Sequence, residues 1–533
     1  MSTYLSKRNL ILTGILLCTL YFLWHNHPFP LDDGAISKQE ASEAALQYLG
    51  LEEATVQTAV TYDADQPIIA YLQKEKLLDS YIAKHELAAP LDYYRVEILQ
   101  EDAVRYEVLV HRYEGIVAGW SKTLAAPLAG GPSDVRTARQ AADEYLSTQR
   151  PGDLTEADIT VQEHPDGSYT FYYEQRDEEI GEAHRIAIVS VAGASVISYH
   201  SSFTPPDHFA QWLDQQDRRS ATFTTFTLWM SVAMAAVALT LAIQYKQAIR
   251  WTDGLVLIGI TIIIETIYYV NTIPSDVSLL ALQQAGPWMF IFDLLFGLVL
   301  TTIFGLTIYM PYLGGRAMLI YEGKQHLLTH TKRAEWQSAV IRSYGLALFI
   351  LALQTMIFSV AESSFHVWWI PDPQLSTDNM LWPLLMPLTA WAAAISEEII
   401  YRLFAVTILR KLLRSNLAAI LVSSMIWALG HTAYPVYPVY TRFVEVTIIG
   451  IVFGYIFIKF GFATAVFTHA VIDSILMGFD VASVGTYGVL VAVIYIAAPL
   501  LIGWVISWRS SSRPIDRGST GRLLPPDLSH RST

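Results

Sequence analysis

Ionisable residues inside an apolar stretch are the first feature of this sequence that points to chemistry. Glu397 and Glu398 are adjacent in the run AISEEIIYRLF, and Arg402 follows four residues after the second glutamate. On a helix Glu398 and Arg402 share a face, so an ion pair can keep Glu398 charged. Glu397 points about 100° away from its neighbour, which leaves its carboxylate free to face another helix. Charged groups within a membrane-spanning helix cost about 2.5 to 3.5 kcal/mol each on insertion scales, and they are functional candidates for that reason.

Two later segments supply imidazoles and a third carboxylate. His431 ends the run WALGH, and the run FTHAVIDSI places His469 and Asp473 four residues apart on one helix face. Together with Glu397 this set suits the activation of water, because a carboxylate in an apolar setting can act as a general base. The imidazoles can bind a metal ion or stabilise an oxyanion. Taken singly, each group could instead be structural, as an ion pair, a helix cap or a packing hydrogen bond.

Three other acidic residues lie within apolar segments, and each stands alone at its position. They are Glu265, Asp293 and Glu445. Bonding between helices or a place beside a water-lined cavity is the expected role of such isolated groups. Glu445 is the strongest candidate for a chemical role, because its segment lies between those of His431 and His469.

The ordered motifs resemble the CPBP family of intramembrane metalloproteases, which includes the CAAX prenyl endopeptidases and many bacterial Abi-type proteins. The family's motifs are EExxxR, FxxxH and HxxxN or HxxxD on successive helices. They match residues 397–402, 427–431 and 469–473 of this sequence. The resemblance covers roughly residues 340–508, and it leaves the N-terminal part of the chain unexplained.

This resemblance implies an intramembrane endopeptidase, similar to CAAX proteases, that acts on a membrane-associated protein or peptide. Glu397 would deprotonate the attacking water with the help of His431, while Glu398 and Arg402 fix the geometry of their helix. His469 and Asp473 would complete the site as metal ligands or as stabilisers of the tetrahedral intermediate. The resemblance also implies zinc, with His431 and His469 as ligands, although a metal-free mechanism stays open because two histidines with carboxylates specify zinc less strictly than HEXXH does.

Two positions depart from the family pattern. Trp427 stands where phenylalanine is usual, which we expect to change packing volume but not chemistry. Asp473 stands where the prenyl-protein peptidases have asparagine, and an ionised carboxylate cannot donate a hydrogen bond to an oxyanion. We therefore expect Asp473 to be a metal ligand or the group that orients His469.

The composition indicates a membrane protein. Of the 533 residues 53% are hydrophobic and only 16% are charged, whereas soluble proteins average about a quarter charged. Residues 26–221 hold about 33 acidic and 15 basic side chains, so the remainder is slightly basic. This distribution argues against nucleic acid as a partner. The single cysteine, Cys18, excludes an intrachain disulfide and a CxxC site.

Long apolar runs predict about ten transmembrane helices. The first, 9–24, follows two basic residues and is interpreted as an uncleaved anchor. The others are placed near 222–245, 254–271, 287–311, 343–361, 381–409, 417–432, 443–460, 462–479 and 484–508. Alternate connections between the apolar runs hold the basic residues of the loops, and the other side receives the acidic domain and loops almost free of basic residues, Arg442 being the exception. The positive-inside rule therefore predicts a multi-pass protein of the cell membrane with both termini in the cytoplasm and residues 29–220 outside it.

The segment before the second apolar run predicts an extracytoplasmic α+β domain of two tandem modules. An internal repeat at an offset of 97 residues relates Ala41, Ala44, Ala45, Tyr48 and Leu49 to Ala138, Ala141, Ala142, Tyr145 and Leu146. Each copy precedes sequence rich in strand-forming residues. Chance similarity between alanine-rich helices is the alternative. Residues 130–132 (Gly-Gly-Pro) are the expected linker.

The predicted organisation of the chain therefore has six parts. They are an anchor at 1–28, α+β modules at 29–130 and 131–220, accessory helices with a cytoplasmic loop at 221–340, a CPBP-like domain at 341–510 and a cytoplasmic tail at 511–533. The alternative functions are a non-catalytic membrane sensor or scaffold, and a transporter that uses the same carboxylates as cation sites. The helical part has no evident internal repeat, which disfavours the transporter.

Overall fold

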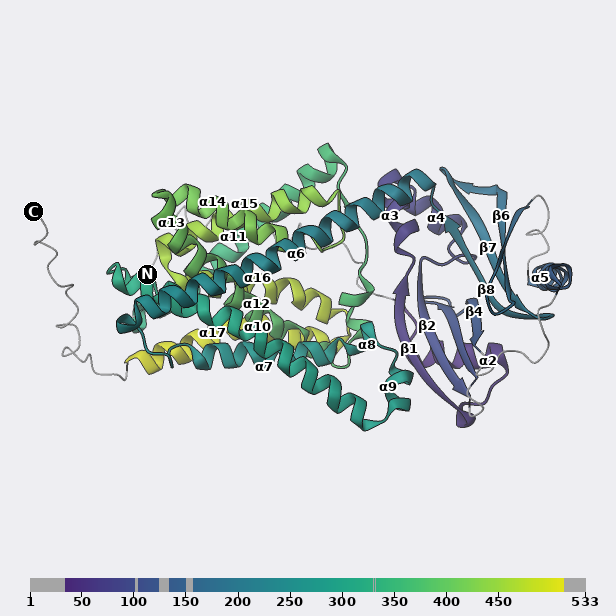
Figure 1. Ribbon diagram of the computed structural model, residues 1–533, viewed down its shortest axis with the longest axis horizontal. Helices are drawn as coiled ribbons and strands as arrows, with labels where there is room; N and C mark the ends of the chain where they lie inside the picture. Colours follow the sequence, from purple (N-terminus) through teal and green to yellow (C-terminus); the bar gives the residue numbers. More distant parts are fainter. Residues whose placement is uncertain are drawn as a thin grey trace, which may run out of the picture.

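The computed structural model describes residues 34–100, 104–123, 134–149, 157–328, 330 and 332–511. Figure 1 shows two parts arranged along the long axis, a bundle of long helices and a domain built on a β-sheet. The predicted anchor at 1–28, the linker at 130–132 and nearly all of the tail at 511–533 lie outside the described residues.

Eight strands form one antiparallel sheet in the order β1-β2-β3-β4-β8-β7-β6-β5. The strands are β1 (Val56–Ala64), β2 (Asp92–Gln100), β3 (Arg105–His111), β4 (Val117–Thr123), β5 (Ala157–Glu163), β6 (Tyr169–Ile180), β7 (Ala183–Ala192) and β8 (Ser195–Thr204). Strands β1 to β4 come from the first repeat and β5 to β8 from the second. The two halves join where β4 pairs with β8, with Trp120 opposite Tyr199. The repeats therefore share one sheet, which the sequence did not indicate.

The repeated alanines lie in two helices that pack on this sheet, α2 (Lys38–Leu49) and α5 (Val135–Gln149). Ala41 and Ala45 are fully buried, as are their counterparts in α5. Alanine at these positions lets the helix backbone approach the strands closely. The repeated tyrosines meet, because the hydroxyl groups of Tyr48 and Tyr145 lie 3.3 Å apart. The offset of 97 residues thus relates two helices in equivalent positions.

Two short helices, α3 (Gln66–Glu75) and α4 (Leu78–Lys84), follow β1. They pack around the first turns of the long helix α6 (Asp207–Gln244), with Tyr71 against Phe209 in an edge-to-face contact. Helix α6 then continues from the sheet domain into the bundle (Figure 1). It is therefore a continuous connection between the two parts.

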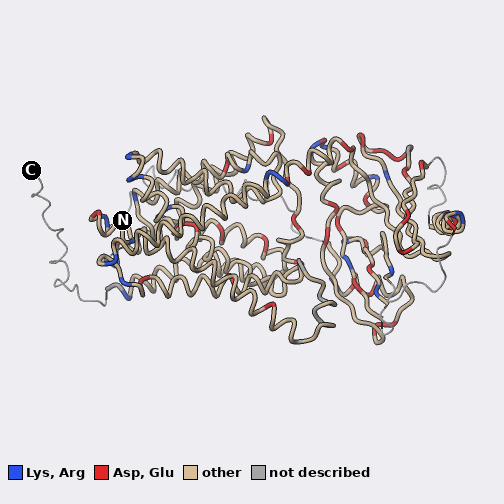
Figure 2. The backbone as a smooth tube through the Cα atoms, viewed as in Figure 1, with Lys and Arg blue, Asp and Glu red and all other residues tan. Residues whose placement is uncertain are grey.

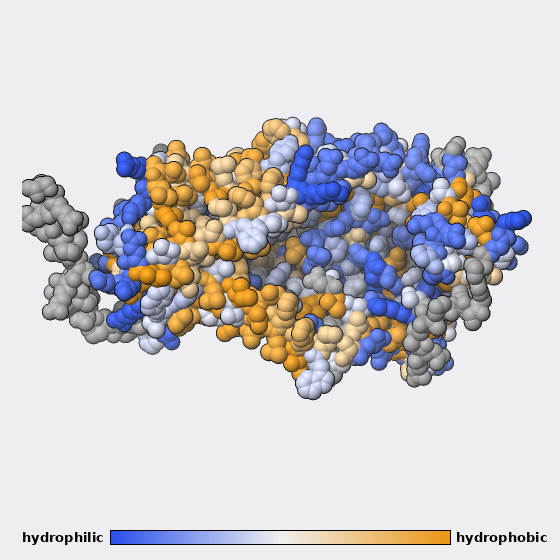
Figure 3. Space-filling view, in the orientation of Figure 1, coloured by the Kyte–Doolittle hydropathy of each residue, from blue (hydrophilic) through white to orange (hydrophobic). Residues whose placement is uncertain are grey.

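Seven helices of the described residues are long and apolar enough to cross a membrane. They are α6, α7 (Leu255–Asn271), α10 (Pro287–Tyr321), α11 (Arg333–Phe365), α15 (Val439–Phe460), α16 (Phe462–Ala482) and α17 (Thr486–Ser511). Figure 3 shows hydrophobic side chains over this part and hydrophilic ones over the sheet domain and the opposite end of the bundle. This apolar band is what a membrane-embedded bundle requires.

The expected ten spans are thus not reached among the described residues. The segment predicted at 381–409 is composite: a 3₁₀ turn η7 (Pro383–Leu388), α12 (Thr389–Glu397), a π-helical segment η8 (Glu398–Val406) and α13 (Thr407–Leu413). The two prolines in η7 remove backbone N–H donors, so the regular helix begins only after them. The segment predicted at 417–432 is the shorter helix α14 (Asn416–Gly430). The residues of η8 are buried among the other helices, whereas α14 packs on α15 and α6 with one face exposed.

The sheet domain contacts the bundle through loops that lie next to the helices carrying the sequence motifs. Strand β9 (Trp368–Trp369), before α12, pairs with β10 (Val436–Tyr437), which follows α14. The indole ring of Trp212 in α6 packs on both strands, through Trp368 and Tyr437. These aromatic contacts attach α6 to the segments that follow α11 and α14.

A second contact joins the sheet edge to the loop before α12. The side chain of Asn379, which is 3% exposed, accepts a hydrogen bond from the backbone N–H of Tyr62 and donates one to its carbonyl, both at 2.7 Å. Nearby, a guanidinium nitrogen of Arg112 lies 2.8 Å from the carboxylate of Asp378. Strand β1 is thereby paired with this loop much as an edge strand is paired with a neighbour.

Lys and Arg side chains gather at the end of the bundle far from the sheet domain (Figure 2). Arg316 and Asp253 form an ion pair there, as do Arg410 and Glu322. Because basic residues favour the cytoplasmic side, this distribution is the one that the predicted orientation requires. The orientation itself stays a prediction.

Candidate active site

The two adjacent glutamates lie where α12 changes into the π-helical segment η8. Single π-helical turns often occur at functional sites. The wider turn changes the hydrogen bonding of the backbone, and the carbonyl of Tyr401 accepts a hydrogen bond from the Ser423 hydroxyl at 2.6 Å. Glu397 and Glu398 thus stand at a local irregularity that α14 supports, and no sequence pattern pointed to it.

Glu398 is sealed in the protein and paired. Its carboxylate is completely buried, and Oε1 lies 3.1 Å from a terminal nitrogen of Arg402, the ion pair expected at this spacing. The guanidinium carbon of Arg402 is 4.1 Å from the ring centroid of Trp427 and 5.0 Å from that of Phe453. These aromatic faces favour a cation between them. Glu398 is therefore placed to support the site and not to meet a substrate.

Glu397 is the accessible member of the pair, with 24% of its side chain exposed. Its Oε1 lies 3.8 Å from Nε2 of His431, and its Oε2 lies 3.8 Å from Nε2 of His469. The indole N–H of Trp427 donates to Oε2 at 2.5 Å. The expectation that Trp427 changes only packing is therefore wrong, because its indole supplies a donor that phenylalanine lacks.

The tautomer of His431 follows from its contacts. Its Nδ1 lies 3.1 Å from the carbonyl oxygen of Trp427, and a carbonyl can only accept a hydrogen bond. The proton of neutral His431 is therefore on Nδ1, and the lone pair on Nε2 faces Glu397. Both His431 and Glu397 thus present basic atoms to the gap between them.

His469 has a different environment. Its Nδ1–H donates to Oε1 of Glu398 at 3.0 Å, while Nε2 lies 3.4 Å from Oδ2 of Asp473. Because Nε2 also faces Glu397, it meets two carboxylates, which requires a proton or another positive charge among the three groups. Glu398, and not Asp473, makes the hydrogen bond that orients this ring.

The structure thus brings together all six residues that the motifs indicated, on three neighbouring helical segments. The zinc expectation fits less well, because no group of three or more His, Cys, Asp or Glu side chains has the arrangement of a metal site among the described residues. His431 and His469 each face a different oxygen of the Glu397 carboxylate. We therefore derive no step through a metal ion.

Glu445 belongs to a different network. It is 2% exposed, and its two oxygens contact Arg442 at 2.6 Å and the side-chain amide of Gln354 at 2.9 Å. It therefore joins α15 to α11, as expected for an acid that bonds helices together. Arg442, the basic residue that broke the charge pattern of the loops, is explained by this pairing.

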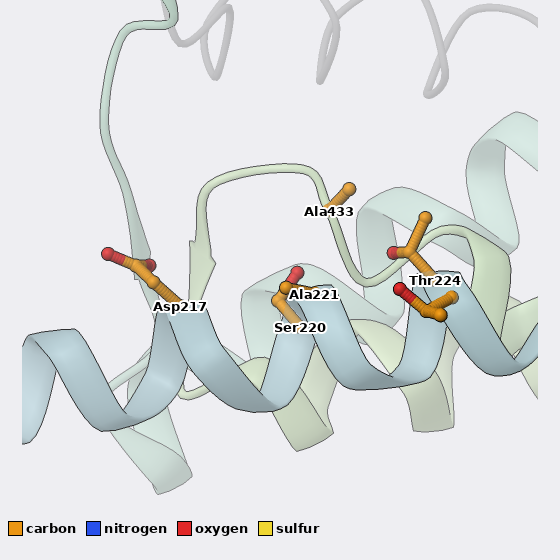
Figure 4. Close-up of a pocket in the computed structure, with 6 residues that line it drawn as sticks. Asp217, Ser220, Ala221, Thr224 and Ala433 are labelled. Atoms are coloured by element: carbon orange, nitrogen blue, oxygen red, sulfur yellow. The ribbon is translucent and has the colours of Figure 1, made fainter.

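A groove opens beside the loop that follows His431 (Figure 4). It has a volume of about 430 Å³ and is lined by Asp217, Ser220, Ala221, Thr224, Thr225 and Ala433. The Ser220 hydroxyl donates to the carbonyl of Thr432 at 2.7 Å, which fixes the loop against α6. Its lining is mostly small and polar.

Comparison with known proteins agrees with the resemblance drawn from the motifs. Residues 379–475 match the family model described as "Type II CAAX prenyl endopeptidase Rce1-like". The chain is also 33% identical, over 138 residues, to the sporulation-killing factor biosynthesis protein SkfC of Bacillus subtilis (strain 168). That stretch is 25% of this chain and 27% of SkfC, so the chain spans about a quarter of the length of this relative. No solved structure matches. The matched range contains all six motif residues.

Proposed function

Because the chain belongs to the CPBP family through residues 379–475, we propose that it is an intramembrane endopeptidase that uses Glu397 to activate water. One observation carries this proposal. Glu397 is the accessible carboxylate of the cluster, and each of its oxygens faces an imidazole nitrogen. Purely structural pairs are sealed, as Glu398 and Glu445 are, whereas Glu397 is open to a substrate.

The geometry supports a simple sequence of steps. A gap of 3.8 Å between Oε1 of Glu397 and Nε2 of His431 is one that a water molecule can bridge. Both atoms accept hydrogen bonds, so the water donates both of its protons and leaves its lone pairs free for attack. Glu397 takes one proton as the oxygen adds to the peptide carbonyl carbon. It then returns that proton to the leaving nitrogen, and the C–N bond breaks.

The other charged groups hold this arrangement in place. Arg402 neutralises Glu398, which in turn holds the His469 ring by its Nδ1–H. The positive charge required between His469 and Asp473 stabilises negative charge that develops nearby. Trp427 holds the Glu397 carboxylate in the orientation that faces both imidazoles. We propose no step that requires a metal ion, and metal analysis of the purified protein tests the zinc expectation.

The substrate we propose is a membrane-associated protein or peptide. The groove between α6 and the loop at Ala433 provides a route for an extended segment. SkfC is described as a sporulation-killing factor biosynthesis protein, and we propose a biosynthetic role of this kind for the present chain, which the experiment below tests. The sheet domain, which we place outside the cytoplasm, would select or restrain the substrate.

Comparison of cleavage products tests the proposal. Membranes and released peptides from cells that express the wild-type chain, Glu397→Gln or Asp293→Asn would be compared by mapping new peptide termini. Glu397→Gln keeps the shape and removes the base, so a set of termini should disappear in this variant and persist in Asp293→Asn, the matched control from another part of the bundle. An unchanged set in Glu397→Gln, with the protein folded and inserted, would favour the sensor or scaffold.

A further inference from the structure

Tyr434 lies at the open side of the candidate site, in the loop between α14 and β10. Its ring is nearly parallel to that of His431, with centroids 6.1 Å apart and planes inclined by 22°. The residue is 46% exposed, whereas the Glu398 side chain beneath the site is sealed. A substrate that reaches Glu397 from this side therefore passes the phenol.

The position of Tyr434 is fixed by Arg442. The guanidinium carbon of Arg442 is 5.1 Å from the centre of the Tyr434 ring. Arg442 is held by the buried Glu445, which also accepts a hydrogen bond from Gln354. Three residues from two helices thus hold the ring against His431. Tyr434 and the residues that hold it have no role in the activation of water by Glu397 and His431.

Hydrolysis needs a hydrogen-bond donor for the oxygen that becomes negative, and the side-chain donors around Glu397 are already directed at other groups. The indole N–H of Trp427 is directed at Glu397, and the Nδ1–H groups of His431 and His469 are directed at a carbonyl and at Glu398. The remaining proton near His469 lies among carboxylates. Asp473, when ionised, cannot donate.

The Tyr434 hydroxyl is an available donor. No hydrogen-bond partner for it is found among the described residues, and a phenol is protonated at neutral pH. The phenol belongs to the ring that lies beside His431, the imidazole that faces Glu397. The hydroxyl is therefore carried next to the pair of residues that would activate the water.

We propose that Tyr434 is a catalytic residue whose hydroxyl donates a hydrogen bond to the oxyanion of the tetrahedral intermediate, with Arg442 as its positioning residue. This rests on the proposed peptidase function and adds a group outside the three motifs. It also accounts for the aspartate at position 473. The donor that asparagine would provide there is supplied from the loop after α14.

The test uses Tyr434→Phe, which keeps the ring and removes the hydroxyl. The substrate is a quenched fluorescent peptide that contains the strongest Glu397-dependent cleavage site, assayed with the purified full chain. Removal of one oxyanion donor typically costs about 10²- to 10³-fold in kcat, so we expect kcat to fall by about 10²-fold while KM changes less than about threefold. Tyr440→Phe, an exposed tyrosine on the next helix, should match the wild type.

A double variant separates donation from structural support. In Tyr434→Phe with Asp473→Asn, the new amide can donate to the oxyanion, so we expect kcat to recover by at least about tenfold over Tyr434→Phe alone. A Tyr434→Phe enzyme as active as the wild type would overturn the proposal, as would a double variant no better than the single one. If instead the wild type and Glu397→Gln are equally inactive, the peptidase function itself fails.

Discussion

Replacement of Arg402 by methionine should strongly destabilise the helical part of the protein. The change leaves the carboxylate of Glu398 at 0% exposure without its cation, 3.1 Å away in the native protein. Breaking a buried ion pair by removing one partner costs about 3 to 5 kcal/mol. Loss of the guanidinium between Trp427 and Phe453 adds to this cost. The hydrogen bond from His469 to Glu398 alone does not neutralise the charge.

Thermal unfolding in detergent, followed by tryptophan fluorescence, measures the effect. At about 2 to 3 °C per kcal/mol for a unit of this size, we expect the apparent midpoint of Arg402→Met to fall by about 6 to 15 °C. Arg410→Met is the matched control, because it breaks a pair with Glu322 at the partly exposed end of the bundle. Its expected cost is about 1 kcal/mol or less.

A second substitution tests the cause. Glu398→Gln in the Arg402→Met background removes the unpaired charge, so we expect at least half of the lost midpoint to return. The reasoning is refuted if Arg402→Met loses no more than Arg410→Met. It is refuted equally if the double variant is as unstable as Arg402→Met.

Three further predictions concern other parts of the structure. Trp427→Phe removes the N–H group that holds Glu397, so kcat should fall by about 10- to 100-fold. This range corresponds to about 1.5 to 3 kcal/mol for a hydrogen bond to a charged group. An unchanged kcat in Trp427→Phe would contradict this prediction. Burial raises the pKa of Glu86 from 4.5 to about 7. Because the folded state favours the neutral acid, the contribution of Glu86 to stability should be largest below about pH 4.5 and be lost as the pH rises through 7. The unfolding midpoints at about pH 5 and pH 8 should therefore differ less in Glu86→Gln than in the wild type, and an equal difference in both proteins would contradict this. Asn379→Ala removes both hydrogen bonds to Tyr62, so hydrogen exchange should speed up in β1 while α12 stays protected. Protection of β1 that is equal in Asn379→Ala and in the wild type would argue against this docking contact.

Short-range spacing made much of the site predictable. The interval from Glu398 to Arg402 predicts an ion pair on one helix face, and the structure contains it. The pairing of His469 with Asp473 was likewise visible as an i,i+4 relation. Such contacts depend only on helix geometry, which a sequence motif encodes directly.

Contacts between helices could not be predicted in the same way. The hydrogen bond from Trp427 to Glu397 depends on how α14 packs against α12, and the orientation of His469 by Glu398 depends on α16. The π-helical turn at Glu398 has no local signature, because tertiary packing selects it. In the sequence, Arg442 was the one basic residue in the loops predicted to lie outside the cytoplasm. The structure explains its position by its ion pair with the buried Glu445.

The same limit applies to the sheet domain. The repeat that relates Tyr48 to Tyr145 could be read from the sequence, but the pairing of β4 with β8 could not. Strand pairing between repeats is a long-range contact set by shape and by the alternation of side chains. Two segments that the sequence predicts to be separate modules therefore form one sheet.

Hydrolysis in oxygen-18 water tests the central claim most directly. The purified wild-type chain is incubated with its peptide substrate in labelled water, and the new carboxyl terminus is analysed by mass spectrometry at early times. We predict one labelled oxygen in that carboxyl group for the wild type and no product above background for Glu397→Gln. Labelled product formed by Glu397→Gln at the wild-type rate would contradict the claim that Glu397 activates the water.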